Sequence, residues 1–303
     1  MTSPAPAFDV SKWTAFIGDL VEAGGPGPQE GATLMAHLDE IRSAWRCGLI
    51  GASEMGELRQ AFGAALSPAT MQGRSFLKRH GYPGDFEIID QIYQQVTSGD
   101  PSLRRWDEFF HAHGAAKAVR NRKVYFGAAL DELSRSGNRV DVLNVASGPC
   151  RDLAEFFESH PSANIHLTCV DQDANAIAHG QELCRRWLDR VEFVQANAFR
   201  FRTNARFDLV WSAGLFDYFD DRRFAVLLSK LLSLAREGGE VVVGNFNEGN
   251  PSAAYQEICG DWPLNYRSAA SLLDVARACG VPDEAIRVES EPERINLFLR
   301  IRC

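Results

Sequence analysis

The sequence predicts an α/β fold over residues 138–303, preceded by an all-helical region over residues 1–137. Before residue 137 apolar residues recur at helical spacing, whereas after residue 138 short β-branched runs alternate with helical segments. The run VDVLNVASGPCRD, residues 140–152, breaks from a strand pattern into a Ser-Gly-Pro turn and restarts as a helix. An acidic residue, Asp171, closes the next apolar run 23 positions after Gly148.

The first region is expected to consist of helices separated by Gly and Pro turns. Asp9 is predicted to cap the first helix, Ser67 a later one, and Asp85 the helix after the turn HGYPGD. Because Pro68 follows Ser67, it would occupy the first turn of its helix. The expected helices cover residues 10–23, 29–49, 53–66, 68–79 and 86–96, with further helices to residue 134.

The second region is expected to form five parallel strands and a closing antiparallel pair. Strands alternating with helices indicate a parallel sheet covered by helices. The predicted strands are 140–145, 165–170, 191–195, 207–211 and 240–246, followed by the terminal pair 285–290 and 295–302. The helices expected between them are 150–159, 174–188, 220–236 and 268–279.

Composition excludes several classes of protein. A net charge of −8 argues against a nucleic acid partner, which requires basic stripes. The seven cysteines show no paired spacing, which favours reduced thiols in a cytoplasmic protein, and no pattern predicts a metal site. No signal peptide pattern or membrane span is predicted, and a homo-oligomer is compatible with the sequence.

The turn after the first predicted strand indicates a nucleoside-containing cofactor. A dinucleotide needs the pattern G-x-G-x-x-G, but here Gly148 is the single glycine, Pro149 lacks an N–H, and Asp152 adds negative charge. S-adenosylmethionine carries a sulfonium cation and no phosphate, so it suits this turn better; a purely structural turn is the alternative. The residues expected to line the cofactor here are Ala146, Ser147, Gly148 and Pro149.

Later strand ends supply further candidates. Asp171 is the expected ribose ligand, with Gln172 beside it. Asp171 or Asp173 could instead cap the next helix, and Asp173 fits that cap better. An amide at Asn197 could bond the adenine amine while Ala198 and Phe199 flank the ring; a plain turn is the alternative. The fourth strand end adds Ser212, Ala213 and Gly214 to the cofactor set, and Asp217 and Tyr218 to the catalytic candidates, which could equally be structural.

These motifs resemble those of Class I S-adenosylmethionine-dependent methyltransferases over residues 138–303. The resemblance is carried by VLNVASGP, Asp171, QANA at 195–198, FDLVWSAGLFDYF and GGEVVVGNF. It implies a Rossmann-like methyltransferase sheet and S-adenosylmethionine as cofactor, although the family motif has glycine where Ala146 and Cys150 stand. HGYPGDFEIIDQIY, AVRNRKVYF, GNFNEGNPS and DWPLNYRS further resemble a bacterial subgroup with a helical extension, associated with 3-hydroxypalmitate methyl ester biosynthesis.

The segments outside these motifs supply candidates for closing the site and holding the acceptor. Tyr82 and Asp85 could meet the cationic end of the cofactor, His80 could act as a base, and Arg120 could bind the methionine carboxylate. A turn with a helix cap, and a solvated basic face, are the alternatives. The expected substrate residues are Asn245, Asn247, Trp262, Tyr266 and Arg267, the last as a clamp for an acceptor carboxylate or an ordinary surface arginine.

The expected reaction is in-line methyl transfer to a small-molecule acceptor, in which positioning and water exclusion do most of the work. A carboxylate acceptor is favoured because it is ionised at neutral pH and needs no base. A small amine or amino acid acceptor would need proton removal by His80, Asp85, Asp217 or Tyr218, and Tyr82 is a further catalytic candidate. A non-catalytic cofactor-binding module is the remaining alternative.

Overall fold

The computed structural model describes residues 9–303, which form two compact units. The helical unit contains the residues up to Ala116 together with Pro251–Pro263, and the sheet unit contains Lys117–Asn250 and Leu264–Cys303. The chain therefore changes unit at residue 116 and returns once to the helical unit, whereas we predicted a single boundary at residue 137. The functional division into a lid and a cofactor domain stays a prediction.

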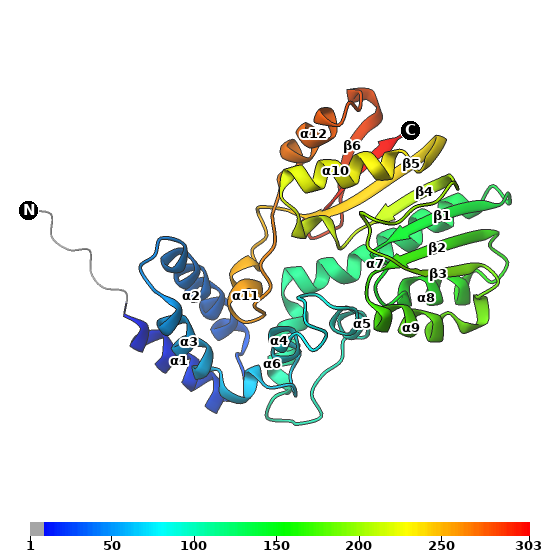
Figure 1. The fold of residues 1–303 in the computed structure, drawn as a ribbon. Coiled ribbons are helices and arrows are strands. Elements are labelled where there is room, and N and C mark those ends of the chain that lie inside the picture. Colours follow the sequence, from blue (N-terminus) through cyan, green and yellow to red (C-terminus); the bar gives the residue numbers. More distant parts are fainter. Residues whose placement is uncertain (1–8) are drawn as a thin grey trace, which may run out of the picture. The chain divides into compact units, whose positions relative to one another are not determined.

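The sheet unit is built on seven strands in the order β3-β2-β1-β4-β5-β7-β6 (Figure 1). Strands β1 to β5 are parallel, and β7 pairs antiparallel with both β5 and β6. This arrangement confirms the predicted sheet with its closing antiparallel pair. The strands are β1 Val140–Val145, β2 Ile165–Asp171, β3 Val191–Gln195, β4 Phe207–Ser212, β5 Ala235–Phe246, β6 Ile286–Ser290 and β7 Asn296–Arg302.

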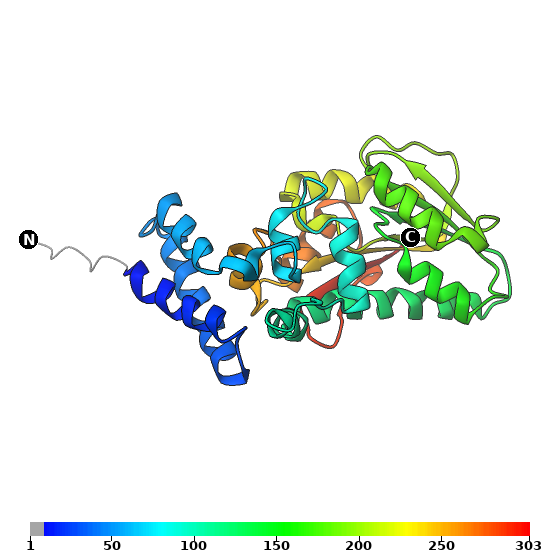
Figure 2. The same ribbon diagram turned by 90° about the horizontal axis from the view of Figure 1, so that it is seen from below.

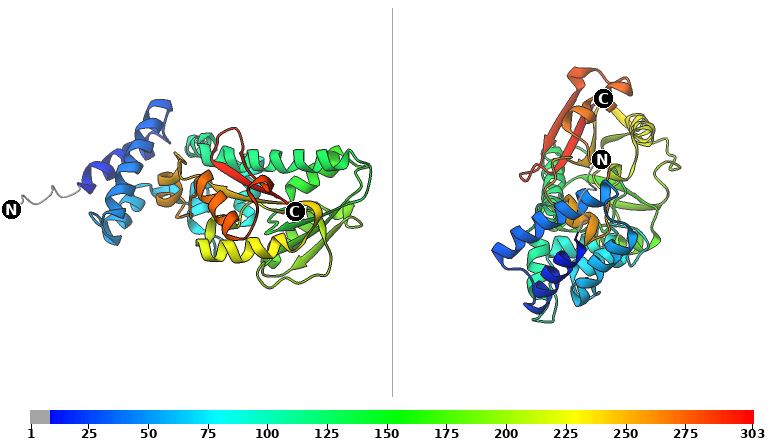
Figure 3. Two further views of the ribbon diagram at one scale, coloured as in Figure 1. Left: turned by 90° about the horizontal axis from the view of Figure 1, so that it is seen from above. Right: turned by 90° about the vertical axis from the view of Figure 1, so that its left-hand side faces the viewer.

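Helices cover both faces of this sheet, and each face has its own apolar core. On one face Phe126 of α7 (Gly114–Ser134) stacks on Trp211, with ring centroids 4.4 Å apart. On the other face Phe224 of α10 (Asp221–Leu232) and Leu272 of α12 (Ala269–Ala278) are buried. Figures 2 and 3 show α7 and α10 on opposite sides of the sheet. The first face also holds α8 (Arg151–Ser159) and packs around the end of α9 (Ala174–Leu183).

The helical unit packs around large buried side chains that include Phe62, Trp106 and Tyr255. Tyr255 belongs to α11 (Ala253–Ile258), which the sequence patterns did not predict. This helix packs on α2, where Arg42 donates to Glu257 at 2.7 and 2.8 Å. The other helices are α1 Val10–Glu22, α2 Pro28–Arg46, α3 Ala52–Ala61, α4 Met71–Leu77, α5 Phe86–Gln94 and α6 Arg104–Ala112, with a 3₁₀ turn Gly63–Leu66.

One predicted helix start is wrong. Thr70, not Ser67, caps α4: its hydroxyl accepts from the Gly73 N–H at 3.1 Å. A Cβ on Gly73 would lie 1.9 Å from the Ser67 carbonyl oxygen, so the chain folds tightly back before the helix begins. The caps predicted at Asp9 and Asp85 are confirmed.

Within residues 9–303, no helix combines the length and the apolar character needed to cross a bilayer.

Candidate functional site

The turn between β1 and α8 is a run of left-handed backbone conformations. Ala146, Gly148 and Cys150 have φ angles of +55°, +58° and +55°. Non-glycine residues rarely adopt this region, because the Cβ crowds the backbone. The chain therefore keeps the backbone conformation of a glycine at the two positions where the related motif has glycine and this sequence has Ala146 and Cys150.

Replacing Ala146 with glycine is expected to leave the free energy of unfolding unchanged or slightly higher. The relief of left-handed strain offsets the extra entropy that glycine loses on folding. The matched control is Ala178→Gly, an exposed position in α9, where the same change should cost about 1 kcal/mol. Urea unfolding of both variants measures the difference; equal losses would show that Ala146 carries no strain.

This turn presents backbone groups more than side chains. The Ser147 N–H donates to the Val170 carbonyl at 3.2 Å, and the Ser147 hydroxyl is buried with no hydrogen-bond partner in the part of the chain that the structure describes. A buried hydroxyl is not exposed to a ligand. Of the four residues predicted here, Ser147 therefore offers no side-chain contact in this conformation.

Asp171 anchors the turn from the end of β2. Its Oδ2 accepts from the Gly148 N–H and its Oδ1 from the Asp173 N–H, each at 3.0 Å. Burial raises the pKa of the Asp171 carboxyl, and these backbone donors partly oppose the shift. A carboxylate accepts about four hydrogen bonds, so each oxygen keeps accepting capacity for ribose hydroxyls. The helix cap is Asp173, whose carboxylate accepts from the Asn175 N–H at 2.8 Å.

The residues after β3 form a closed turn. The Asn197 Oδ1 accepts from the Phe199 N–H at 3.0 Å, and its Nδ2 donates to Gln172 at 3.1 Å. The Ala198 carbonyl accepts from Lys230 at 2.7 Å, and the Phe199 ring lies edge-on to Phe219. Both polar atoms of the Asn197 side chain therefore have protein partners, which corresponds to the plain turn considered from the sequence.

At the carboxyl end of β4, the chain brings an unpredicted arginine to the site. The Ser212 hydroxyl donates to the Val145 carbonyl at 2.9 Å and is fully buried, so it ties β4 to β1. Arg122 of α7 donates from Nη1 to the Ala213 carbonyl at 2.8 Å. A Cβ on Gly214 would lie 3.2 Å from that nitrogen, so glycine makes room for the guanidinium.

Two acids, Asp152 and Asp217, lie within the electrostatic influence of Arg122. Burial raises the pKa of Asp152, in the first turn of α8, to about 6, and Arg122 opposes the shift. Burial also raises the pKa of Asp217 to about 6, again opposed by Arg122. The Asp217 carboxylate accepts from the Phe246 N–H, so it connects the segment after β4 to the end of β5. The arrangement of one cation with two acids suits a ligand that carries charges of both signs.

From the sequence we predicted Arg120 as the ligand of the methionine carboxylate, and that role stays a prediction. Arg122 was not among the predicted site residues. Burial lowers the pKa of the Arg120 guanidinium, while the charge of Glu293 opposes that shift. Residues two apart on a helix point in different directions, so Arg120 and Arg122 do not share a face. The missed signal is that Arg122 stands three residues after Val119 and four before Phe126, both fully buried, on the stripe of α7 that faces the core.

The stability of the chain is expected to fall as pH rises from about 4 to 6 because of Asp217. Its folded pKa of about 6 exceeds an unfolded value of about 4, so the folded chain binds more protons in this range. Asp217→Asn removes this titration. The free energy of unfolding of the variant, relative to the wild type, should therefore increase by up to about 2–3 kcal/mol between pH 4 and 7. Urea unfolding at several pH values measures it; a pH-independent difference would contradict it.

Arg267, predicted to clamp an acceptor carboxylate, has its hydrogen-bond donors engaged by the protein. Arg267 is buried and donates from Nε and Nη2 to Asp221 at 3.0 and 2.8 Å, and from Nη2 to the Phe219 carbonyl at 2.6 Å. Its Nη1 donates to Asn245 at 2.8 Å and to the Phe216 carbonyl at 3.4 Å. All five N–H groups have acceptors, so none remains for an acceptor carboxylate.

Asn245 has the same structural role, because its Nδ2 donates to the Phe246 and Asn265 carbonyls and its Oδ1 accepts from Arg267. Asn247 is partly buried, and its Nδ2 donates to the Arg294 carbonyl at 3.1 Å. Tyr266 and Tyr218 are both partly exposed. Of the acceptor candidates in the sheet unit, Asn247 has a partly exposed side chain, whereas the hydroxyl of Tyr266 is buried.

The remaining candidates lie in the helical unit. The His80 Nε2 pairs with Glu87 at 2.9 Å, and its ring packs on Phe86. The Asp85 carboxylate accepts from the Ile88 N–H at 2.9 Å as the cap of α5. Tyr82 is partly exposed, and Trp262 is buried. His80 and Asp85 are thus already engaged in the local structure, which corresponds to the turn with a helix cap considered from the sequence.

Comparison with known proteins gives a family match within the sheet unit. Residues 142–239 match the family model of a methyltransferase domain. No curated protein sequence gives a significant match. A possible exported protein from Bordetella parapertussis is 18% identical with a TM-score of 0.63, covering 100% of this chain and 99% of its own.

Two further solved structures share the fold. Magnesium protoporphyrin IX methyltransferase from Synechocystis PCC 6803 is 13% identical with a TM-score of 0.53, covering 76% of this chain and 98% of its own. The S-adenosylmethionine-dependent methyltransferase SibL is 18% identical with a TM-score of 0.51, covering 87% of this chain and 77% of its own.

Residues 142–239 are therefore similar to methyltransferase domains. With the sheet order, this match confirms the predicted Rossmann-like fold and the predicted enzyme class, and with the class its cofactor, S-adenosylmethionine.

Proposed function

We propose that this protein transfers the methyl group of S-adenosylmethionine to a carboxylate oxygen of a small molecule, forming a methyl ester. The charge of the site is the observation that supports S-adenosylmethionine as the methyl donor in this reaction. The turn is anchored by Asp171, and Asp152 and Asp217 lie near Arg122, an arrangement unsuited to a diphosphate and suited to a cationic cofactor. When bound, the cofactor supplies a methyl group activated by its sulfonium charge.

The residues present fit that cofactor. Asp171 would accept hydrogen bonds from the ribose hydroxyls, and the backbone at Ala146, Gly148 and Pro149 would line the nucleoside. Arg122 would bind the methionine carboxylate by a charge-assisted bond. Asp152 would favour the positive charges at the same end of the molecule.

Arg122→Gln is expected to weaken cofactor binding by about tenfold, the effect of losing one hydrogen bond to a charged group. Arg120→Gln is the matched control and tests the role that the sequence predicts for that residue. Calorimetric titration of both variants with S-adenosylhomocysteine, which keeps the carboxylate, gives the affinities. A larger loss in Arg120→Gln would reverse the assignment, and equal wild-type affinities would remove both residues from the carboxylate.

Two of the residues considered as general bases already have hydrogen-bond partners, which supports a carboxylate as the acceptor. His80 is paired with Glu87, and the Asp217 carboxylate accepts from the Phe246 N–H. A carboxylate needs neither of them, since it is already ionised at neutral pH. Catalysis then rests on alignment and water exclusion, which the helical unit would provide as a lid. Membership of the subgroup with a 3-hydroxypalmitate acceptor is the finer form of this proposal.

Methylation of a small amine is the second candidate, and one observation favours it. Asp217 has a pKa of about 6, close to the value of an effective general base at neutral pH. An ammonium acceptor would have to lose a proton before it could attack. Asp217 would have to give up part of its hydrogen bond to Phe246 to accept that proton.

The nature of the product separates these candidates. The full-length protein is incubated with methyl-tritiated cofactor and a fractionated cell extract, and the labelled product is treated with alkali. A methyl ester releases volatile tritiated methanol, as we expect. Label that resists alkali would identify an amine product and overturn the ester proposal. Measured cofactor binding with no transfer to any fraction would instead indicate a non-catalytic binding module.

Free cysteines support a reducing compartment, so a cytoplasmic location is part of the proposal. We also propose that the protein has no nucleic acid partner, because its net charge is −8. An assembly into homo-oligomers stays a prediction.

A further inference from the structure

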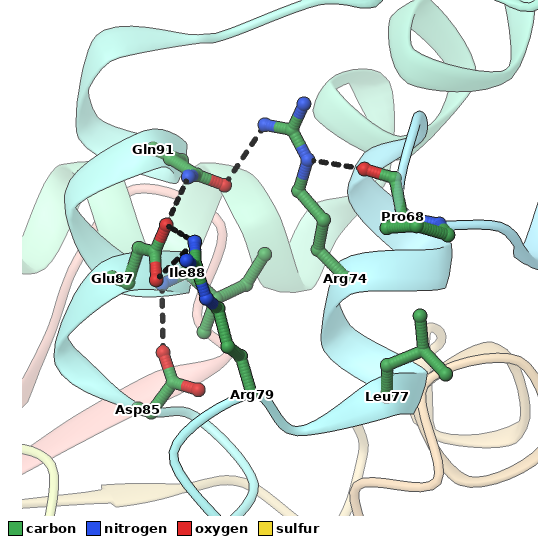
Figure 4. Close-up of a pocket in the computed structure, with 8 residues that line it drawn as sticks. All are labelled: Pro68, Arg74, Leu77, Arg79, Asp85, Glu87, Ile88 and Gln91. Carbon is green, nitrogen blue, oxygen red and sulfur yellow. Dashed lines mark hydrogen bonds and ion pairs between the residues drawn. The ribbon is translucent and has the colours of Figure 1, made fainter.

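Helices α4 and α5 of the helical unit enclose a pocket of about 500 Å³ between them. A pocket of this size falls within the usual range for small-molecule sites. Figure 4 shows its lining side chains, which come from the two helices and from the segments just before each. They are Pro68, Arg74, Leu77, Arg79, Asp85, Glu87, Ile88 and Gln91.

The pocket has a polar level, formed by Arg74 and Gln91, and an apolar level, formed by Pro68, Leu77 and Ile88. On α4, Arg74 is the polar lining residue and Leu77 the apolar one. On α5, Glu87 and Gln91 are polar and Ile88 is apolar. Arg74 donates to the Gln91 amide oxygen at 3.1 Å across the polar level (Figure 4). Leu77 is 51% exposed, an unusual fraction for a leucine that lines a concave surface.

Arg74 is a positioned cation without an acidic partner. Its Nε donates to the Pro68 carbonyl at 2.9 Å and its Nη1 to Gln91, both neutral acceptors. Among residues 9–303 it forms no ion pair, and both N–H groups of Nη2 have no acceptor. Asp107, which Arg74 also stabilises electrostatically, already accepts from the backbone N–H groups of Met71 and Ser98.

The two acids of the lining are already committed to protein groups. Glu87 accepts from Arg79, His80 and Gln91 at 3.1, 2.9 and 3.3 Å. The hydrogen bond from Gln91 Nε2 fixes the amide so that its oxygen faces Arg74 (Figure 4). Asp85 accepts from the Ile88 N–H as a helix cap. The guanidinium of Arg74 is therefore oriented by neutral hydrogen-bond acceptors, and neither acid of the lining forms an ion pair with it.

We propose that this pocket binds an amphipathic organic anion, with its charged head on Arg74 and its apolar body along Leu77, Ile88 and Pro68. A guanidinium with two free N–H groups takes a carboxylate or a phosphate by charge-assisted hydrogen bonds. The apolar level shields the tail of such a ligand from water. The site lies within the helical unit and does not depend on the proposed methyl transfer.

Hexanoate is the probe, titrated into the full-length protein without cofactor and followed through the methyl NMR signals of Leu77 and Ile88. Acetate lacks the tail and hexanol lacks the charge, so each should bind at least about tenfold more weakly than hexanoate, with saturation by hexanoate in the millimolar range or below. Hexyl phosphate, titrated in parallel, shows which head group Arg74 prefers. Binding of either anion above both controls supports the site.

Arg74→Gln should weaken hexanoate binding about tenfold or more, and Arg104→Gln, an exposed arginine of the same unit, should leave it unchanged. Leu77→Asn provides an independent test, because an exposed side chain is replaced without disturbing the fold, and it too should weaken binding. Equal affinity in wild type and Leu77→Asn, or no preference for hexanoate over acetate and hexanol, overturns the proposal. Its failure would leave cofactor binding and methyl transfer untouched, so the two proposals are tested separately.

Discussion

Replacing Arg267 with methionine is expected to lower the free energy of unfolding by about 3–5 kcal/mol, because the Asn245 oxygen and two backbone carbonyls lose their donor at about 1–3 kcal/mol per buried group. The guanidinium of Arg267 is 5% exposed and satisfies Asp221, Asn245 and the carbonyls of Phe216 and Phe219. It also lies over the Phe224 ring at 4.6 Å. Methionine fills part of the volume, but it leaves these acceptors without donors.

The control for this loss is Arg222→Met, at an exposed position one residue beyond Asp221. That substitution should change stability by no more than about 0.5 kcal/mol. Urea denaturation followed by circular dichroism measures both. A loss below about 1 kcal/mol in Arg267→Met would contradict the structural role of this arginine and return it to the acceptor site.

Replacing Asp171 with alanine is expected to weaken S-adenosylmethionine binding by about 10–100-fold. Two effects act together. The variant loses the carboxylate proposed to bind the ribose, and it loses the acceptor that holds the Gly148 N–H at 3.0 Å. Isothermal titration calorimetry with the cofactor measures the change in affinity.

Asp173→Ala separates these effects from a general loosening of the segment. Asp173 caps α9, so this variant should lose about 1 kcal/mol of stability and keep its cofactor affinity. Asp171→Asn keeps one oxygen acceptor for the turn and loses the charge, so it should fall between wild type and Asp171→Ala. Wild-type affinity in Asp171→Ala would remove this carboxylate from the ribose.

The strand order and the turn could be predicted from sequence because local patterns determine them. The β-branched runs located β1 to β4 within one residue, whereas β5 starts five residues before its predicted start. The single glycine and Asp171 predicted the cofactor end of the sheet. Asp173 was recognised as the better helix cap from its position alone. These features depend on residues close together in the chain.

The polar side chains of the site could not be assigned in this way, because their partners are distant in sequence. Arg267 looked available for a ligand, yet its acceptors come from segments 22 to 51 residues earlier. Arg122 looked like one member of a basic cluster, yet its carbonyl partner is 91 residues later. Helical periodicity around Val119 and Phe126 could have singled it out, because charged residues seldom occupy an apolar stripe.

Helix α11 lies in the middle of the sheet unit's sequence but belongs to the helical unit, which matters for expressing the sheet unit by itself. The chain leaves that unit after Asn250 and returns at Leu264. The segments before and after this insertion are joined by a hydrogen bond from the Glu248 N–H to the Arg267 carbonyl at 3.4 Å. A truncated chain lacking only the amino-terminal helices would leave Ala254, Tyr255 and Ile258 without their partners, and such apolar surface promotes aggregation. Because the two ends lie side by side, a few glycines and serines could replace residues 251–263, and that shortened loop is the design to express.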